Sequence, residues 1–333
     1  MDELTTGTRD RRGHWWPKLH AGIAPIFVFP PQPRSFLRWL PTYFLPWNVL
    51  FFLSAAVLWW LLTPGMDTLS ALAPGWVLYI LARNTAAVGL FYGALEVPLY
   101  IQRRQAARFK YNPAFPEDRE NGAFWWKSQT RDNMARSLLF AVPIWTAWEV
   151  LILWAFASGR APMSTSAADP LWLLGIALIV PFIHHVHFYL IHRLLHVPAL
   201  YRHIHAWHHK AVNPSPWSSL SMHPVELVLY FSGAGLHLMI ASHPLLVLYH
   251  LHYAGFGAAI GHIGFHTIET GKDKGVDTHA FTHYLHHKYF EVNYGEGLVP
   301  IDKWMGTWHD GSDEGERLME ARRRRSALGR RGT

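Results

Sequence analysis

The chain has 333 residues, of which 50% are hydrophobic, 15% aromatic and only 16% charged. Soluble domains carry about 25% charged residues, so this balance indicates a membrane protein. The lack of cysteine excludes thiolate metal sites, iron–sulfur clusters and disulfides. The net charge of +7 comes from basic residues near the ends of apolar segments and in the run Arg322–Arg325, which favours an anionic lipid surface over nucleic acid.

Residues 1–43 are polar to mixed and rich in proline, and we expect an N-terminal segment on the cytoplasmic side. Four apolar segments follow, each close to the roughly twenty residues that a helix needs to cross a bilayer. We place these spans at about residues 43–62, 76–101, 137–157 and 171–191. Arg83, Asn84, Glu96 and Glu149 lie inside them and are costly in hydrocarbon, so we expect them near an interface or facing the bundle interior.

The loops between these spans differ in basic residues. Residues 102–136 are rich in Lys and Arg, whereas residues 64–74 contain none and residues 158–170 contain only Arg160. By the positive-inside rule, the N-terminus and the 102–136 loop are cytoplasmic. The fourth span then delivers His192 to the cytoplasmic face.

Two further apolar stretches, 225–240 and 245–265, are interrupted by proline and glycine. They form either a re-entrant hairpin or a fifth and a sixth span, and both topologies return His262 to the face that holds His192. Residues 269–278 are polar and predict a loop. Residues 311–333 are a charged basic tail, which we expect to be solvated or to lie on lipid headgroups.

Histidine is concentrated in one region, since 21 of the 23 histidines lie between His184 and His309. Four clusters have the i, i+3 or i, i+4 spacing that places side chains on one helix face. Their members are His192 and His196; His205, His208 and His209; His262 and His266; and His283, His286 and His287. Neutral imidazole binds iron, zinc, copper and nickel. Because one such ion takes about four to six ligands, ten histidines predict a site for two metal ions.

A single buried histidine is more often a core residue than a ligand, but that explanation does not cover four clusters of one spacing. The series HRxxH, HxxHH and HxxHH resembles the fatty acid hydroxylase and sterol desaturase superfamily. The residues Leu200–Arg202, Ser221–Glu226, Phe290 and Asn293–Gly295 match as well, and the resemblance covers about residues 180–310. One departure is His187, at a position where members often have an acidic residue.

This resemblance implies an all-α fold, an integral membrane helical bundle with a cytoplasmic, histidine-rich, di-metal helical cap. Residues 44–310 would form the oxygenase domain, and the ten histidines would hold two iron ions with O2 as co-substrate. An all-nitrogen site also binds zinc, so zinc is expected in some purified samples. The enzyme would hydroxylate or desaturate a fatty acyl chain, a sterol or an isoprenoid, and the sequence does not distinguish these outcomes.

Several other residues are expected to support the ligands rather than to bind metal. The resemblance carries over the HPxE motif, so we expect His223 and Glu226 to orient ligands or to stabilise the fold. Asn293 of the NYG motif is assigned a similar supporting role. His184, His185 and His187 are interpreted as structural or supporting residues, with extra metal ligands as the alternative, and His279 is left unassigned.

Two alternatives use histidine in other ways. A membrane haem electron carrier needs separate histidine pairs on facing helices within the spans. A zinc-binding or metal-transport protein would use four ligands per zinc ion or place ligands along a path at the bilayer midplane. Neither pattern accounts for HxxHH clusters at span ends.

An oxygenase also requires electrons, and the sequence contains no flavin, nicotinamide or fused haem motif. We therefore expect an external donor, a ferredoxin or a cytochrome with its reductase. Basic residues at 103–110 and 322–325 would steer such an acidic carrier, or would hold anionic lipid.

Overall fold

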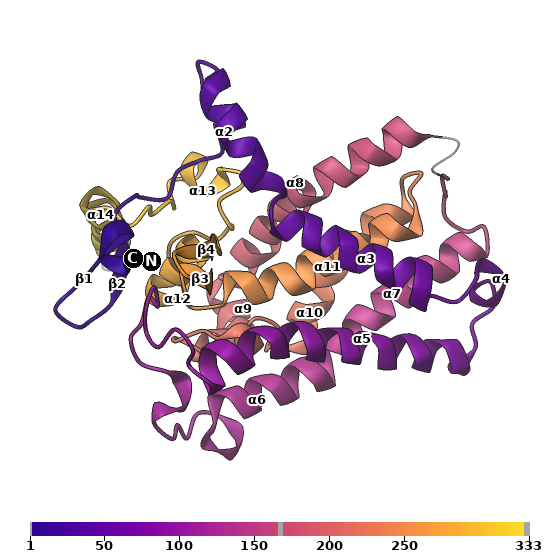
Figure 1. Ribbon diagram of the computed structural model, residues 1–333, viewed down its shortest axis with the longest axis horizontal. Coiled ribbons are helices and arrows are strands. Elements are labelled where there is room, and N and C mark those ends of the chain that lie inside the picture. The colour runs from indigo at the N-terminus through magenta and orange to yellow at the C-terminus, as the bar shows by residue number, and fades with distance from the viewer. Residues whose placement is uncertain (1, 166–168, 330–333) are drawn as a thin grey trace.

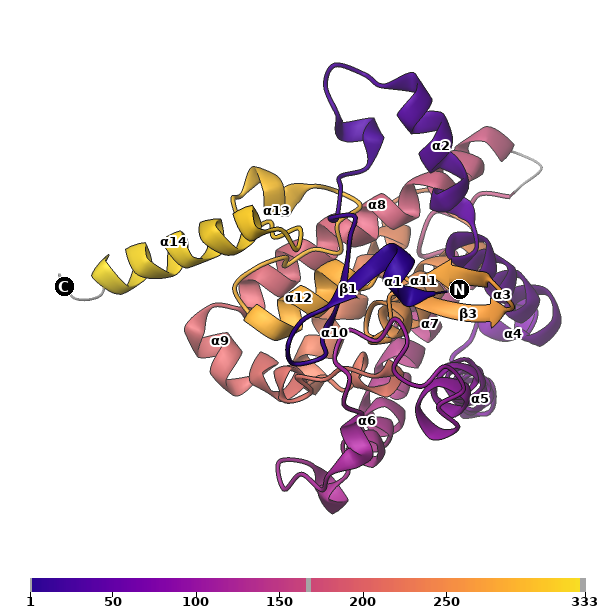
Figure 2. The ribbon, with the colours of Figure 1, turned by 60° about the vertical axis from the view of Figure 1, so that its left-hand side comes forward.

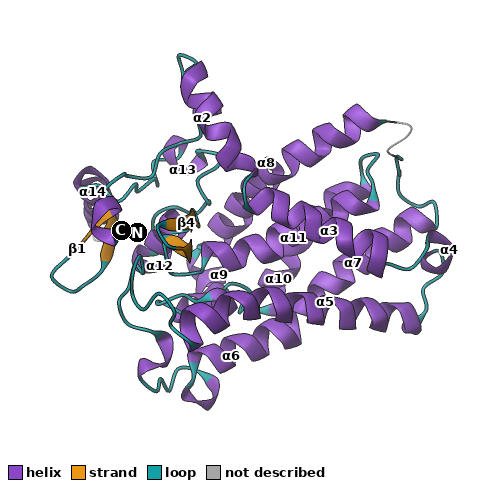
Figure 3. Cartoon of the chain, viewed as in Figure 1, coloured by secondary structure: helices purple, strands orange, loops and turns teal. Residues whose placement is uncertain are grey.

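The computed structural model describes residues 2–165 and 169–329. This part of the chain is mostly helical, as predicted, and also contains two short β-hairpins (Figures 1 and 3). Four of its helical segments are long and apolar enough to cross a membrane. They comprise α2 (Pro33–Phe44) with α3 (Trp47–Leu62), α5 (Pro74–Glu96) with a π-helical end (Val97–Ile101), α6 (Gln129–Arg136) with a π-helical turn (Ser137–Ala141) and α7 (Val142–Ala157), and α8 (Pro170–Leu195).

Proline residues mark where several of these helices begin or end. Pro74 and Pro170 occupy the first turn of α5 and α8, where the missing backbone N–H would have had no partner within the helix. Helix α3 ends at Leu62, two residues before Pro64, because a residue that precedes proline is disfavoured in the helical conformation. A short helix, α4 (Met66–Leu69), then connects α3 to α5.

The charged residues within the long helices face the bundle interior, as predicted. Arg83 of α5 forms a buried ion pair with Glu149 of α7. Asn84 donates to Glu149 Oε2 at 2.8 Å and to Thr146 Oγ1 at 3.1 Å. Arg83 also donates to Thr63 Oγ1 at 2.8 Å. This network satisfies polar groups that would otherwise be costly to bury, and it ties α5 to α7.

The two further apolar stretches form a buried hairpin. Helix α10 (Pro224–Phe231) continues into a 3-10 helix (Ser232–Leu238), and α11 (Pro244–Gly261) returns. Helix α10 has 8 residues, too few to cross a bilayer. Nearly every residue of α11 is buried, and α11 packs against α3, α5, α7 and α8. The hairpin is therefore a central element of the bundle, which explains why its sequence is apolar on all sides.

A cap of short elements covers one end of the bundle, on the left in Figure 1. Its helical parts are α9 (Pro198–His203), a 3-10 helix (His205–Lys210), α12 (Phe281–Tyr289) and α13 (Ile301–Trp304). The N-terminal segment, with α1 (Glu3–Thr6), β1 (Gly7–Arg9) and β2 (Trp15–Pro17), lies over α12 (Figure 2). Trp15 is fully buried and packs against Phe109 and Tyr111.

One part of the cap differs from prediction. The polar stretch 269–278 is mostly an antiparallel hairpin of β3 (Thr267–Gly271) and β4 (Lys274–Asp277) rather than a loop. Ile268 pairs with Val276 across it, and such apolar cross-strand pairs stabilise short hairpins in otherwise polar sequence. The tail forms α14 (Asp313–Gly329), in which Arg323 pairs with Glu291 at 3.1 Å.

Candidate metal centre

Four structural elements bring the histidine clusters to one place beneath the cap. The C-terminal end of α8 carries His192, and His196 follows immediately after it. The 3-10 helix at 205–210 carries the second cluster, the residue after α11 is His262, and α12 carries the last cluster. Nine of the ten predicted histidines fall into two neighbouring groups, in each of which one side-chain nitrogen per residue lies within 4.8 Å of the others.

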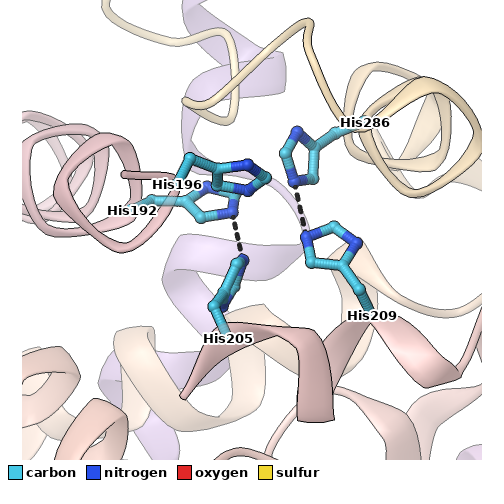
Figure 4. A group of neighbouring side chains, drawn as sticks. All are labelled: His192, His196, His205, His209 and His286. Carbon is cyan, nitrogen blue, oxygen red and sulfur yellow. Dashed lines mark hydrogen bonds between the residues drawn. The ribbon is translucent and has the colours of Figure 1, made fainter. Parts of the chain in front are cut away.

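The first group has five members, shown in Figure 4: His192, His196, His205, His209 and His286. His192 Nε2 lies 3.0 Å from His205 Nε2, and His286 Nε2 lies 3.1 Å from His209 Nε2. Their rings point toward a common centre from three elements of the chain.

The second group has four members, all buried: His208, His262, His283 and His287. His262 Nε2 lies 3.1 Å from His208 Nε2 and 3.0 Å from Nε2 of both His283 and His287. One imidazole nitrogen has a single proton or a single lone pair and cannot hydrogen-bond three others at once. Two nitrogens at right angles on an ion, each about 2.0–2.1 Å from it, would stand about 3 Å apart. The donor set therefore fits a bound transition-metal ion better than it fits a hydrogen-bond network.

The backbone fixes which nitrogen of three histidines is available. In each, Nδ1–H donates to a carbonyl oxygen, which leaves Nε2 unprotonated and directed into the group. The pairs are His192 with Tyr294 at 2.7 Å, His286 with Val292 at 2.7 Å, and His262 with Ala258 at 2.9 Å. Sequence reasoning did not find Val292 or the role of the Tyr294 carbonyl, because a backbone carbonyl leaves no signal in residue type.

The carboxyl group of Glu226 orients a fourth histidine, His205. His205 Nδ1–H donates to Glu226 Oε1 at 2.7 Å, and the two residues are 1% and 3% exposed. His223 lies at the start of α10, where its Nδ1 accepts from the Val225 N–H at 3.2 Å. The structure thus places Glu226 against a histidine of the first group and His223 at a helix N-terminus.

Asn293 holds the loop that supplies the carbonyl groups. Its side chain donates to the Thr282 oxygen at 3.1 Å and the His309 oxygen at 2.8 Å, and it accepts from the His309 N–H at 2.8 Å. Asn293 has a positive φ of 50°, a conformation that asparagine adopts more readily than most residues. These bonds position the neighbouring Tyr294 carbonyl against His192.

Burial keeps the cap histidines neutral. It lowers the pKa of His208 to about 4 and lowers the pKa values of His205, His283 and His287 well below the ordinary value, with the neighbouring imidazoles adding to the effect for these three. A neutral ring is the form that binds metal, so the centre offers ligands at physiological pH without prior deprotonation.

Neither group includes His266. Helix α11 ends at Gly261, and Gly264 has a φ of +73°, so the chain reverses before it reaches His266. The four-residue spacing therefore does not lie on a helix here. His266 instead packs on Trp15, with ring centroids 4.9 Å apart, and its Nδ1 lies 3.3 Å from Tyr111 Oη.

The other histidines of interest also have partners outside the two groups. His185 Nε2 lies 2.9 Å from Tyr253 Oη, and His187 Nε2 lies 3.0 Å from Ser232 Oγ. His184 packs among Phe188 and other rings of the bundle. His279 is exposed in the turn after β4.

A cavity of about 590 Å³ leads to the second group. It lies between the N-terminal segment, α2, α3, α11 and the cap, and His283 is part of its lining. Trp39, Tyr43, Trp47 and Phe51 contribute aromatic surface from α2 and α3. Its size and largely apolar lining are those of sites that bind small organic molecules.

Comparison with known proteins finds one matching family model and several similar proteins. Residues 177–307 match the family model described as fatty acid hydroxylase. The chain is 26% identical over 255 residues to a Delta(7)-sterol 5(6)-desaturase of Aspergillus fumigatus, covering 69% of this chain and 74% of that protein. A Delta(7)-sterol 5(6)-desaturase of Gibberella zeae is 26% identical over 244 residues, which is 72% of this chain and 73% of that protein. One from Leptosphaeria maculans is 32% identical over 126 residues, or 38% of this chain and 35% of that protein. No solved structure matches the chain.

Proposed function

The chain belongs to the fatty acid hydroxylase and sterol desaturase superfamily, and on that premise we propose that it is a membrane oxidoreductase that uses two iron ions and O2 to desaturate or hydroxylate a sterol or a related lipid. The observation that carries the proposal is the convergence of nine histidines into two adjacent groups beside a largely apolar cavity. Two groups of five and four nitrogens supply enough ligands for two ions.

The two irons, when bound, would supply the activation of O2 that attack on an unactivated C–H bond requires and that amino-acid side chains cannot perform. The chain's own residues hold and orient that centre. The carbonyl groups of Tyr294, Val292 and Ala258 and the carboxyl group of Glu226 fix the ligand rings. The aromatic cavity holds the lipid with its reacting carbon near His283 and excludes water.

This arrangement does not favour the two alternatives. A haem carrier needs two axial ligands per haem, whereas the imidazole nitrogens here lie 3.0–3.1 Å apart. Zinc can occupy such a site in a purified sample, but a zinc protein has no need for a lipid-sized cavity beside its ligands. The lipid oxidoreductase accounts for both features.

We also propose that the cap faces the cytoplasm and receives electrons from a separate protein. The basic 102–136 segment supports this orientation. Lys110 cannot help to steer a donor, because it is fully buried and donates to the Asn112 and Ala114 carbonyl groups. Exposed Arg193 is better placed, since its guanidinium carbon lies 4.4 Å from the centre of the Tyr294 ring, and that ring contacts His196 at 4.8 Å.

The test is product analysis with the full chain in lipid nanodiscs. The iron-loaded protein, given O2 and a ferredoxin or cytochrome with its reductase, should remove two hydrogens from, or add one oxygen to, a Delta(7)-sterol or an acyl lipid, as measured by mass spectrometry. The His262→Ala variant should form no product, and the matched variant His203→Ala, at an exposed position at the end of α9, should be active. If the wild-type protein carries two irons and oxidises none of a broad set of lipids, the proposal is wrong.

A further inference from the structure

The cavity that reaches His283 contains a polar cluster that the metal centre does not use. The cluster consists of His185 from α8, Tyr253 from α11 and Glu296 from the segment after α12, and all three residues line the cavity. His185 Nε2 lies 2.9 Å from Tyr253 Oη and 3.4 Å from Glu296 Oε2. Three separate elements thus bring polar atoms together in a wall that is otherwise largely apolar.

The cluster has unused hydrogen-bonding capacity. His185 is 6% exposed, and within the described part of the chain its buried Nδ1 has no hydrogen-bond partner. Burial also raises the pKa of Glu296 to about 7. The Glu296 side chain is 22% exposed and lines the cavity, so its carboxyl oxygens can form hydrogen bonds with a ligand bound there.

The shape of the cavity restricts what that ligand is. Its aromatic walls on α2 and α3 face α11, where Gly257 leaves room because it has no side chain. The ligand is therefore mainly apolar, with a polar group small enough to sit among His185, Tyr253 and Glu296. A hydroxyl group fits, since it donates one hydrogen bond and accepts others.

We propose that His185, Tyr253 and Glu296 bind the hydroxyl group of the lipid substrate and so determine which carbon is presented to the metal centre. This inference rests on the proposed function. The substrate hydroxyl donates to the Glu296 carboxylate and accepts from Tyr253 Oη, and His185 holds these two groups in place. When the hydroxyl group is bound there, the neighbouring carbons of the lipid lie along the cavity wall that includes His283. An acyl chain without a hydroxyl group cannot be held in this way.

The test measures binding and does not depend on turnover. Full-length protein in nanodiscs is titrated with a fluorescent sterol that carries a 3β-hydroxyl group and with its 3-deoxy analogue, and energy transfer from tryptophan reports the affinity. The wild type should bind the hydroxylated sterol at least about tenfold more tightly, because a site built for a hydroxyl rejects an analogue that lacks it. We expect each of three variants, Tyr253→Phe, His185→Gln and Glu296→Gln, to reduce that preference to less than about threefold. The main cause should be a lower affinity for the hydroxylated sterol.

The control is His187→Gln, on the same helix but bonded to Ser232 instead of the cluster, and it should keep the full preference. Tyr253→Phe preserves size, and an unchanged metal content confirms that each variant is folded. Equal affinity of the wild type for both sterols, or full preference in all three cluster variants, would overturn the inference. Either result can occur while the protein still oxidises lipid, so it is distinguishable from failure of the proposed function.

Discussion

Glu226 accepts a hydrogen bond of 2.7 Å from His205, and both side chains are buried. The bond holds the imidazole in one tautomer and one orientation, with Nε2 facing His192 at 3.0 Å. The orientation of this ring depends on two elements, because the carboxyl group lies on α10 and the histidine lies on the 3-10 helix His205–Lys210.

Replacing Glu226 should therefore weaken the metal centre. Loss of a carboxylate that orients a ligand histidine typically costs 10–100-fold in metal affinity, and we expect Glu226→Ala to fall in this range when iron or zinc affinity is measured by competition with a chelator. His223→Ala removes only the bond to the Val225 N–H, so it should lower stability by about 1 kcal/mol and leave affinity unchanged. Equal metal affinity of Glu226→Ala and wild type would refute the role of the carboxyl group.

The buried pair of Arg83 and Glu149 predicts a different response. Removing one partner leaves an unpaired charge in the bundle, so Glu149→Leu should destabilise the protein by about 3–5 kcal/mol in denaturant unfolding. The double variant Arg83→Met/Glu149→Leu should recover most of that loss. A double variant as unstable as the single variant would show that packing, rather than charge, is the main contribution.

The low pKa values of the cap histidines predict acid sensitivity of the metal-free protein. In the unfolded chain, His208 takes up a proton near pH 6.5, whereas in the folded chain its pKa is about 4. The unfolded state thus binds more protons between these values, and stability falls as pH is lowered through this window. For each such histidine the loss approaches about 1.4 kcal/mol per pH unit. Melting temperatures of metal-free protein at pH 7 and pH 5 measure it, and a flat profile would contradict the assignment.

Electron delivery should depend on Arg193. Its exposed charge beside Tyr294 would attract an acidic donor, so Arg193→Gln should slow reduction of the centre several-fold at low salt, with a smaller difference at high salt. Arg160→Gln removes the same charge from an exposed position in the loop after α7, outside the cap, and should have no effect. Stopped-flow reduction by the donor provides the rates. A salt-independent rate in the wild type would exclude electrostatic docking.

The helical fold and the four long apolar helices could be predicted from the sequence, because apolar composition and proline residues at helix ends determine these helices locally. The spacing of the histidines also selected the nine that the structure gathers, and α12 carries the whole last cluster on one helix. The same spacing does not bring His266 into either group, because the chain turns at Gly264 before it reaches that residue. The cluster around His185 could not be predicted, since it joins residues from three elements whose packing only the fold defines.

The count of metal ions tests the central claim most directly. We predict about two irons per chain in protein reconstituted anaerobically with ferrous iron, measured by elemental analysis. His262→Ala removes the nitrogen that lies within 3.1 Å of three others, so the second group should lose its ion and the count should fall to about one. His266→Ala should retain both ions, because neither group includes that residue. A wild-type count of one or none, or a loss with His266→Ala equal to that with His262→Ala, would contradict the account.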